Sequence, residues 1–382
     1  MRGRTAYILI LSVVSLLAIG IVMLQSTGAF APDSRGDMYH FVRRQTFWLC
    51  IGLVVLVGAS MTDYRWWGKF WPHLYALAAV LLVLCFVPPI GMKINGSWRW
   101  INLGFASFQP SELAKVAALV FLAWWYHRHE NETKSFLRGF VMPLGAVALL
   151  IGLIAMEVDL GASALIGLTA VCVMFVGGAS LLWLVPMFVA GLAGLVYAVW
   201  HNPERFARIS AFLDPGSESV RLNEGLQQWQ AMVAFGSGGV SGAGLGNGRL
   251  KMLYLPYAHT DFIFPMIGEE LGLRFTLLVV FCFLLMLLAG ALIAMNAKDR
   301  FGMLLGFGIT IVIALQAAIN IGVTTSLLPN KGMPLPFISY GGSNLAVNML
   351  LVGILLNIHR QGRRLPKPRT RAVPATSLAV RF

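Results

Sequence analysis

Asp261 is the side chain of this sequence best placed for acid–base chemistry. It stands in the run HTDFIF at 259–264, where a long glycine-rich segment meets an apolar stretch of about 20 residues. An ionisable group at the mouth of a membrane span is costly unless it is solvated, paired or used, so Asp261 is a candidate active group. The alternative is that Asp261 only caps the following helix, because Asp readily accepts backbone N–H groups of a first helical turn.

Two further charged side chains, Glu112 and Lys115, stand three residues apart in the run QPSELAK at 109–115. At that spacing they share one face of a helix and can pair. Such a pair can lock helix packing, or it can hold Lys115 toward an anionic ligand. Just upstream, Arg99 lies between two tryptophans, and tryptophans at such positions commonly anchor a protein at the membrane surface.

Carboxylates also stand at Glu157, Asp159 and Glu269. The first two separate predicted spans, and they are either solvated loop charges or part of a polar outer cavity. Glu269 follows Asp261 by eight residues, a spacing that would place both on one helical face. We therefore expect Glu269 to contribute to a polar lining rather than to face lipid.

The segment 328–344 reads LPNKGMPLPFISYGGSN and contains both Lys331 and Ser339. Its prolines and glycines forbid a regular helix. Irregular backbone at membrane depth is tolerated only where it is buried in protein or lines a wet cavity. The segment is therefore expected to wall the same outer cavity that Asp261 faces.

The composition predicts that membrane-spanning helices position these groups. The chain of 382 residues is 58% hydrophobic and 12% charged, with a mean hydropathy of +0.74. Apolar runs of about 20 residues in such a composition predict transmembrane helices rather than a soluble domain. We therefore predict an all-α, polytopic membrane protein with about ten transmembrane helices. The expected spans are 6–26, 46–61, 73–90, 111–126, 138–156, 160–178, 181–200, 265–296, 302–325 and 341–359.

The net charge of +13 does not indicate nucleic-acid binding, because of where the basic residues lie. With the N-terminus inside, Lys and Arg concentrate in the inner segments and in the tail 362–382, and the outer loops carry few. The positive-inside rule then places both termini in the cytoplasm. The basic tail is expected to be disordered and to lie on anionic membrane lipids. The first span is too long for a signal-peptide core, so an uncleaved anchor is expected.

One large extracytoplasmic loop is expected at about 201–264. Arg208 lies in its first part, 203–213, where the spacing of charged and apolar residues predicts a helix on the outer membrane surface. A second short helix is expected at 224–235. The glycine-rich run 236–248 lacks the Gly-Lys-Ser/Thr ending of a P-loop, so it is expected to let backbone turn or approach a ligand rather than to bind a nucleotide.

Taken together, these motifs resemble the SEDS family (shape, elongation, division and sporulation), whose members are membrane glycosyltransferases that polymerise lipid II into peptidoglycan. The resemblance covers one membrane domain, 1–361, and is closer to the division member FtsW than to the elongation member RodA. The motifs that carry it are RWI (99–101), QPSELAK (109–115), DLG (159–161), the 227–246 loop, HTDFIF (259–264) with GEELG (268–272), and PLPFISYGGS (334–343). The chain departs from the family pattern at Val158, Tyr257 and Asn344, and Tyr257 leaves open any role for a second carboxylate beside Asp261.

The resemblance implies a peptidoglycan glycosyltransferase that serves septal cell-wall synthesis in the bacterial cytoplasmic (inner) membrane. Asp261 is implied as the general base. It would accept the proton of a sugar 4-hydroxyl while that hydroxyl attacks an anomeric carbon and polyprenyl pyrophosphate leaves. The residues expected to bind substrate are Arg99, Glu112, Lys115, Arg208, His259, Lys331 and Ser339.

The implied partners are lipid II, the growing glycan strand, a class B penicillin-binding protein that cross-links strands, other divisome proteins and membrane lipids, with no nucleic acid. No metal-ligating cluster is predicted, so a divalent cation (Mg or Mn) would have to be shared with lipid phosphates. The alternatives are a RodA-like elongation polymerase, a noncatalytic scaffold and a lipid II flippase. A flippase needs a polar path on both sides of the membrane, whereas the candidate charges all belong to the outer half.

Overall fold

The computed structural model describes residues 4–28, 37, 39–94, 96–104, 106–213, 223, 225–252 and 258–362. The expected basic tail and Tyr257 lie outside the described residues. Helices dominate the described part, which confirms the predicted all-α class. They are α1 (Arg4–Gly28), α2 (His40–Met61), α3 (Arg65–Lys69), α4 (Trp71–Leu84), α5 (Pro110–Arg128), α6 (Met142–Met156), α7 (Leu160–Val176), α8 (Leu181–Trp200), α9 (Pro203–Leu213), α11 (Leu226–Gly238), α12 (Ile263–Met295), α13 (Arg300–Thr324) and α14 (Gly342–Gly362).

Each predicted span corresponds to a helix. Within the described ranges, seven helices are long and apolar enough to cross a membrane, namely α1, α2, α6 with the π-helical turn before it, α8, α12, α13 and α14. The helices α4 and α7 are apolar but shorter, and α5 is almost wholly buried among its neighbours. The chain is therefore a multi-pass membrane protein.

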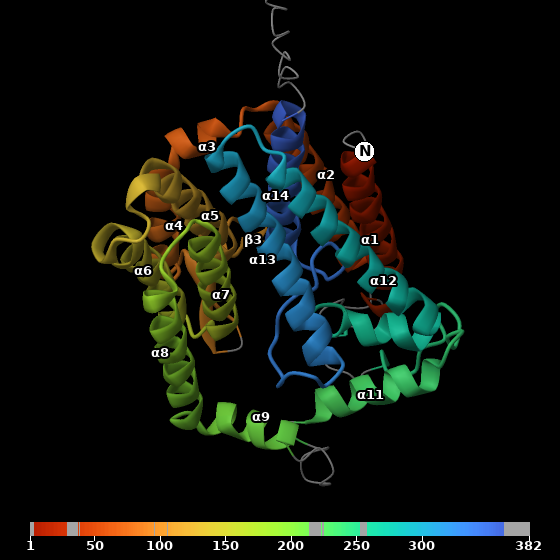
Figure 1. The fold of residues 1–382 in the computed structure, drawn as a ribbon. Helices are drawn as coiled ribbons and strands as arrows, with labels where there is room; N and C mark the ends of the chain where they lie inside the picture. Colours follow the sequence, from red (N-terminus) through yellow and green to blue (C-terminus); the bar gives the residue numbers. More distant parts are fainter. Residues whose placement is uncertain are drawn as a thin grey trace, which may run out of the picture.

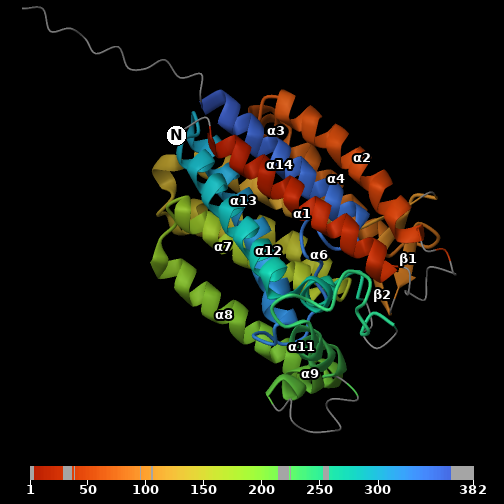
Figure 2. The same cartoon turned by 90° about the vertical axis from the view of Figure 1, so that its right-hand side faces the viewer.

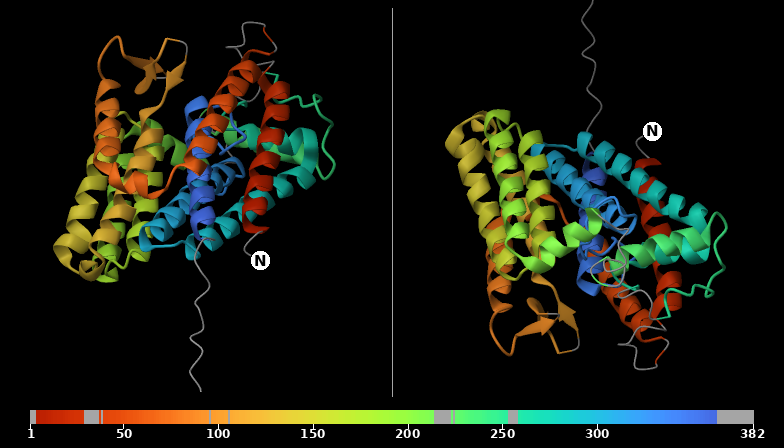
Figure 3. Two further views of the ribbon diagram at one scale, coloured as in Figure 1. Left: turned by 90° about the horizontal axis from the view of Figure 1, so that it is seen from above. Right: turned by 90° about the horizontal axis from the view of Figure 1, so that it is seen from below.

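The helices form a bundle around α13, which packs on α5, α7, α12 and α14 (Figure 1). On one flank α1 packs against α12 and α2 packs against α14 (Figure 2). The helices α4, α5, α6, α7 and α8 lie on the other flank (Figure 1). Arg4 and Gly362 lie at one end of the bundle. The opposite end carries α9, α11 and a small sheet (Figure 3), and we call it the loop end.

The small sheet is a feature that the sequence analysis did not predict. Strands β1 (Gly91–Ile94), β2 (Ser97–Asn102) and β3 (Ser107–Phe108) pair antiparallel in the order β1-β2-β3. Gly96, at the turn between β1 and β2, has a φ of +79°, which glycine adopts at little cost. The sheet holds Arg99 and its two tryptophans on β2.

The loop helices α9 and α11 confirm the two short helices expected before the glycine-rich run. This run packs against the start of α12, and none of its residues lines the main cavity of the described structure. Gly272 interrupts α12 with a φ of +78°, which frees backbone carbonyls of the preceding turn. Ala243 N and Gly244 N donate to the carbonyl oxygens of Glu269 and Glu270, at 2.9 and 3.0 Å.

The expectation that Glu269 lines a polar cavity with Asp261 is wrong. The Glu269 carboxylate points back to the glycine-rich run and accepts hydrogen bonds from Arg249 N (2.7 Å) and Leu250 N (3.3 Å). The shared helical face assumed for the two residues does not exist, because α12 begins at Ile263, after Asp261. Glu269 therefore stabilises the loop.

Candidate active site

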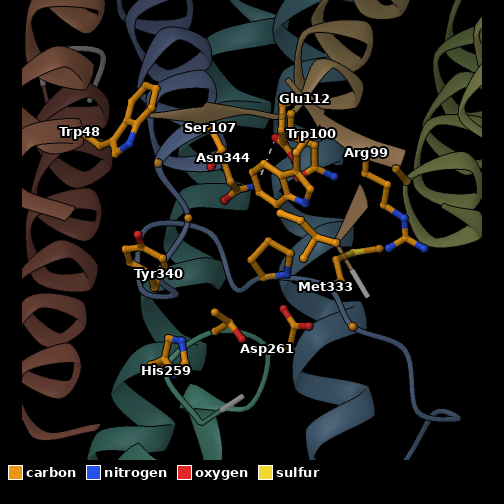
Figure 4. A pocket seen from close by; sticks show the side chains of 18 of the residues that line it. Trp48, Arg99, Trp100, Ser107, Glu112, His259, Asp261, Met333, Tyr340 and Asn344 are labelled. Carbon is orange, nitrogen blue, oxygen red and sulfur yellow. Dashed lines mark hydrogen bonds between the residues drawn. The ribbon is translucent and has the colours of Figure 1, made fainter. Parts of the chain in front are cut away.

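A cavity of about 910 Å³ opens at the loop end of the bundle. Its walls come from the start of α2, the small sheet, the first turns of α5 and α7, the segment before α12, the middle of α13, and the irregular segment before α14. Asp261 lies in the wall of this cavity, with Arg99 on one side and Trp48 on the other (Figure 4). The irregular segment at 328–344 contributes to the wall as predicted.

The backbone at Asp261 is fixed by α13. Asn320 Nδ2 donates to the carbonyl oxygen of Asp261 at 2.8 Å and to that of Met333 at 2.6 Å. The helix-capping alternative is wrong, since the N-cap of α12 is Phe262 and has no side-chain cap hydrogen bond. A Cβ at Gly332 would lie 2.5 Å from the Asp261 carboxylate, so a residue without a side chain is required there. The Asp261 carboxylate therefore does not cap α12.

Burial raises the pKa of Asp261 from 3.8 to about 6. This value is the net result, because the negative charge of Asp159 acts in the same direction as burial and the positive charges of Lys331 and Arg99 oppose both. The carboxylate is consequently ionised for the most part at neutral pH and is a stronger base than an exposed aspartate. A pKa near the working pH favours general acid–base catalysis.

Arg99 is held at the cavity wall by the backbone of the α6–α7 link. Its Nη2 donates to the carbonyl oxygen of Val158 at 2.7 Å, and its Nε to that of Glu157 at 3.4 Å. Asp159 lines the cavity beside it and accepts from Ala162 N at 3.2 Å, which caps α7. Because carbonyls carry only partial charge, the guanidinium keeps a net positive charge toward the cavity.

Glu157 does not line the cavity, although Asp159 does. The Glu157 side chain is fully buried and lies against the thiol of Cys85. Burial raises the pKa of Glu157 to about 8. The solvated-loop alternative for Glu157 is therefore wrong, and its carboxyl group is neutral for the most part at pH 7.

Glu112 and Lys115 form the predicted pair deep in the cavity, with 2.7 Å between Nζ and Oε2 and both side chains buried. Lys115 Nζ also donates to Gln316 Oε1 at 2.9 Å, and Asn344 Nδ2 donates to Glu112 Oε2 at 3.2 Å. The pair thus joins α5, α13 and α14 while it lines the cavity. The Glu112–Lys115 pair can therefore hold the helices together and also contact a ligand.

Ser339 and His259 tie the two irregular segments together. Ser339 Oγ donates to the carbonyl oxygen of Thr260 at 2.6 Å, and Tyr340 N donates to that of His259 at 3.0 Å. The His259 ring lies in the cavity wall, 4.5 Å from the Phe41 ring between centroids. Ser339 is buried and absent from the wall, so it acts on the backbone beside Asp261.

The remaining two predicted residues differ in position. The side chain of Lys331 crosses the start of α7, where a Cβ on Gly161 would meet its Cε at 2.6 Å, and its charge acts on Asp261. Arg208 is exposed on α9 and does not line the cavity. The structure thus brings together every predicted site residue except Arg208, with Lys331 and Ser339 adjacent to the cavity wall.

Sequence analysis missed several residues that line the cavity or support it. Gln316 and Asn320 are amides inside an apolar span, and that alone is a signal of an internal polar contact. No such signal marked the first turns of α2, because their charges read as ordinary interfacial residues. The missed residues of that region are Asp37, His40, Arg44 and Trp48.

Known proteins are similar in sequence to this chain over almost its full length. The sequence model of the family described as "Cell cycle protein", which covers FtsW, RodA and SpoVE, matches residues 7–364. The chain belongs to this family, the SEDS family. A "Probable peptidoglycan glycosyltransferase FtsW" of Geobacter metallireducens is 37% identical over 364 residues, covering 95% of this chain and 96% of the relative. The "Stage V sporulation protein E" of Bacillus subtilis is 38% identical and covers 93% of this chain and 97% of its own.

Solved structures of SEDS proteins share the fold. The rod shape determining protein RodA of Thermus thermophilus superposes with a TM-score of 0.68 at 25% identity, over 92% of this chain and 95% of that one. A structure titled "Structural coordination of polymerization and crosslinking by a peptidoglycan synthase complex" superposes with a TM-score of 0.76 at 26% identity, over 93% and 98%. Among SEDS proteins, the chain is FtsW-like.

Proposed function

We propose that this chain is a peptidoglycan glycosyltransferase that polymerises lipid II into glycan strands for septal cell-wall synthesis. The observation that carries the proposal is the position of Asp261, whose raised pKa and placement between cationic side chains suit a base beside an anionic leaving group. Relatives that share over nine-tenths of the chain bear the name of this activity. An elongation-type role is the alternative within the family.

Asp261 would act as the general base of glycosyl transfer. The 4-hydroxyl of the acceptor sugar attacks the anomeric carbon of the donor, and its proton passes to the Asp261 carboxylate. The bond between that carbon and the pyrophosphate oxygen breaks, with inversion at the anomeric carbon, and polyprenyl pyrophosphate leaves. A positioned base of this kind contributes typically about 10²–10⁴-fold to the rate.

Arg99 and Lys331 would stabilise the leaving pyrophosphate. Both act electrostatically on Asp261, so both lie close to the reacting atoms. Cations that are fixed before the reaction stabilise developing negative charge without a reorganisation cost. Lys115 lies deeper in the cavity, where its ion pair with Glu112 reduces its net charge. We therefore propose that this pair binds and positions the sugar rings of the substrate.

A divalent cation would also fit, although the protein alone offers few ligands. No group of three or more His, Cys, Asp or Glu side chains is placed to hold a metal within the described ranges. Asp159 and Asp261 both face the cavity, so Mg²⁺ or Mn²⁺ could take their oxygens together with substrate phosphate and water. Such an ion would neutralise charge on the leaving group.

The cellular setting follows from the same family. We propose that both termini are cytoplasmic, that the loop end faces the extracytoplasmic side, and that the protein works at the division septum. A class B penicillin-binding protein would cross-link the strands, consistent with the synthase complex among the similar structures. Other divisome proteins and membrane lipids would complete its surroundings.

The test is polymerisation of purified lipid II by the purified full chain, with and without its transpeptidase partner. Glycan strands resolved by length are the expected product. The matched control for loss of Asp261 is Asp63→Asn, because Asp63 is exposed and lies between α2 and α3 at the opposite end of the bundle. Lipid II translocation into the opposite leaflet without any polymer, measured in vesicles, would instead identify a flippase.

A further inference from the structure

The cavity has a second cationic end, on the α2 side. Arg44 and His40 line it there, and Trp48 follows Arg44 by one helical turn on the same face. Trp48 and Arg99 lie on opposite sides of the cavity, and Asp261 lies lower in the same view (Figure 4). The cavity wall thus carries cationic side chains from two different elements, Arg99 on β2 and Arg44 on α2.

Arg44 is electrostatically different from its neighbour Arg43. Arg43 pairs with Asp37, so the negative charge at this end of the cavity is neutralised. The Arg44 guanidinium forms no hydrogen bond or ion pair with any residue that the structure describes. A guanidinium offers donors in a planar fork that matches the oxygens of phosphate. An unpaired one in a cavity wall is therefore suited to an anion.

The chemistry of glycosyl transfer requires two anions at different distances from the base. In the donor, pyrophosphate is bonded directly to the anomeric carbon under attack, so it must lie beside the base. In an acceptor lipid II, the attacking 4-hydroxyl belongs to the outer sugar, and two sugar rings separate it from its own pyrophosphate. The acceptor's anion must therefore be held farther from the base than the donor's.

The two cationic ends meet this requirement. The charges that act on the Asp261 carboxylate are those of Asp159, Lys331 and Arg99, and the charge of Arg44 is not among them. The near end, with Arg99 and Lys331, therefore suits the donor. The far end, with Arg44, suits an anion that lies away from the reacting atoms.

We infer that Arg44 binds the pyrophosphate of the acceptor lipid II, while Arg99 and Lys331 serve the pyrophosphate of the donor. This inference rests on the proposed glycosyltransferase function and assigns a substrate subsite within the same cavity. Arg44 is accordingly a specificity-determining residue for the acceptor, because it recognises an anion at a set distance from the attacking hydroxyl.

The test separates the two substrates chemically. The donor is a lipid II whose outer-sugar 4-hydroxyl is methylated, so that it cannot attack. The acceptor is a lipid II analogue with a methylene group in place of the anomeric oxygen, which keeps its negative charge and 4-hydroxyl but cannot lose pyrophosphate. One turnover joins the donor disaccharide to the acceptor oxygen and releases polyprenyl pyrophosphate, giving a single tetrasaccharide product whose rate is measured against each substrate.

Arg44→Gln should raise the KM for the acceptor by about tenfold or more, as expected for loss of a charge-assisted hydrogen bond. The KM for the donor and kcat should stay within about twofold of the wild type. Arg44→Lys keeps the charge without the fork and should recover part of the loss. The matched control is Arg128→Gln, which removes the same charge from an exposed arginine at the end of α5 away from the cavity and should leave both KM values unchanged.

Three results would overturn the inference. An unchanged acceptor KM in Arg44→Gln would show that Arg44 is an interfacial anchor only. A raised donor KM would reverse the two ends. Equal effects of Arg44→Gln on the charged acceptor and on a phosphate-free disaccharide acceptor would exclude anion recognition. Failure of the proposed function is distinguishable, since in that case the wild-type protein would form no tetrasaccharide at all.

Discussion

Replacing Asp261 by Asn should make the protein more stable and should greatly slow polymerisation. The raised pKa, from 3.8 to about 6, means that the folded state disfavours the charged carboxylate. The shift corresponds to at most about 3 kcal/mol, or about 1–3 kcal/mol once the partial exposure of the side chain is allowed for. Asn has nearly the same shape and no charge, so it avoids this cost. Polymerisation should fall about 10²-fold or more.

The sign of the effect fixes its pH dependence. Because the folded pKa lies above the unfolded value, the stabilising contribution of this group is complete below pH 3.8 and is lost as the pH rises to about 6. The difference in melting temperature between Asp261→Asn and wild type should therefore be largest above pH 6 and should shrink toward pH 4. Because a protonated Asp261 cannot accept a proton, wild-type polymerisation should also decline below about pH 6.

Stability is measured by thermal melting in detergent, monitored by tryptophan fluorescence. Polymerisation is measured on the same preparation as the length of glycan strands made from labelled lipid II. Asp63→Asn is the control for removing a carboxylate and should change neither. A folded Asp261→Asn protein that polymerises at the wild-type rate would refute the assignment of the base. A variant whose melting temperature is lower at every pH would show instead that the Asp261 carboxylate has a structural role.

Three further changes probe the rest of the structure. Lys115→Met should destabilise the protein by about 3–5 kcal/mol, because Glu112 would remain buried without its partner; adding Glu112→Gln should restore melting but not polymerisation, and restored polymerisation would limit the pair to packing. Glu157→Gln should preserve both properties, since the buried Glu157 carboxyl is already largely neutral at pH 7, and a large loss would show that it acts as a charged group. Ser210→Cys on the exposed face of α9 should react with an impermeant thiol reagent in intact spheroplasts, and reaction only after lysis would reverse the proposed orientation.

Hydropathy predicted the membrane helices because burial in lipid requires long apolar runs whatever their neighbours are. It could not predict the sheet at 91–108, which is short and depends on pairing between segments separated by turns. Hydropathy also gave no basis for excluding Arg208 from the cavity. The direction of α9 relative to the bundle depends on tertiary contacts at the loop end, and periodicity along one helix does not contain that information.

The error at Glu269 has a specific physical cause. Counting eight residues from Asp261 assumed one continuous helix, but α12 begins after Asp261 and is interrupted at Gly272. The interruption leaves backbone carbonyls without helical partners, and the glycine-rich run supplies the missing N–H groups. A glycine followed by an apolar run carries no signal of such an interruption unless the segment that satisfies it is known.

The polar residues around the cavity divide into two groups with different roles. Asn320 and Ser339 donate to carbonyl oxygens of the segment that carries Asp261, so they satisfy irregular backbone that lipid could not satisfy. Arg99 and Arg44 instead present charge to the cavity from elements at its edges. Some polar side chains around the cavity therefore fix the backbone that carries Asp261, whereas others present charge to the cavity itself. Asp261 lies between these two groups. Asn320 and Ser339 fix its backbone, and burial together with the surrounding charges sets the pKa of its carboxylate.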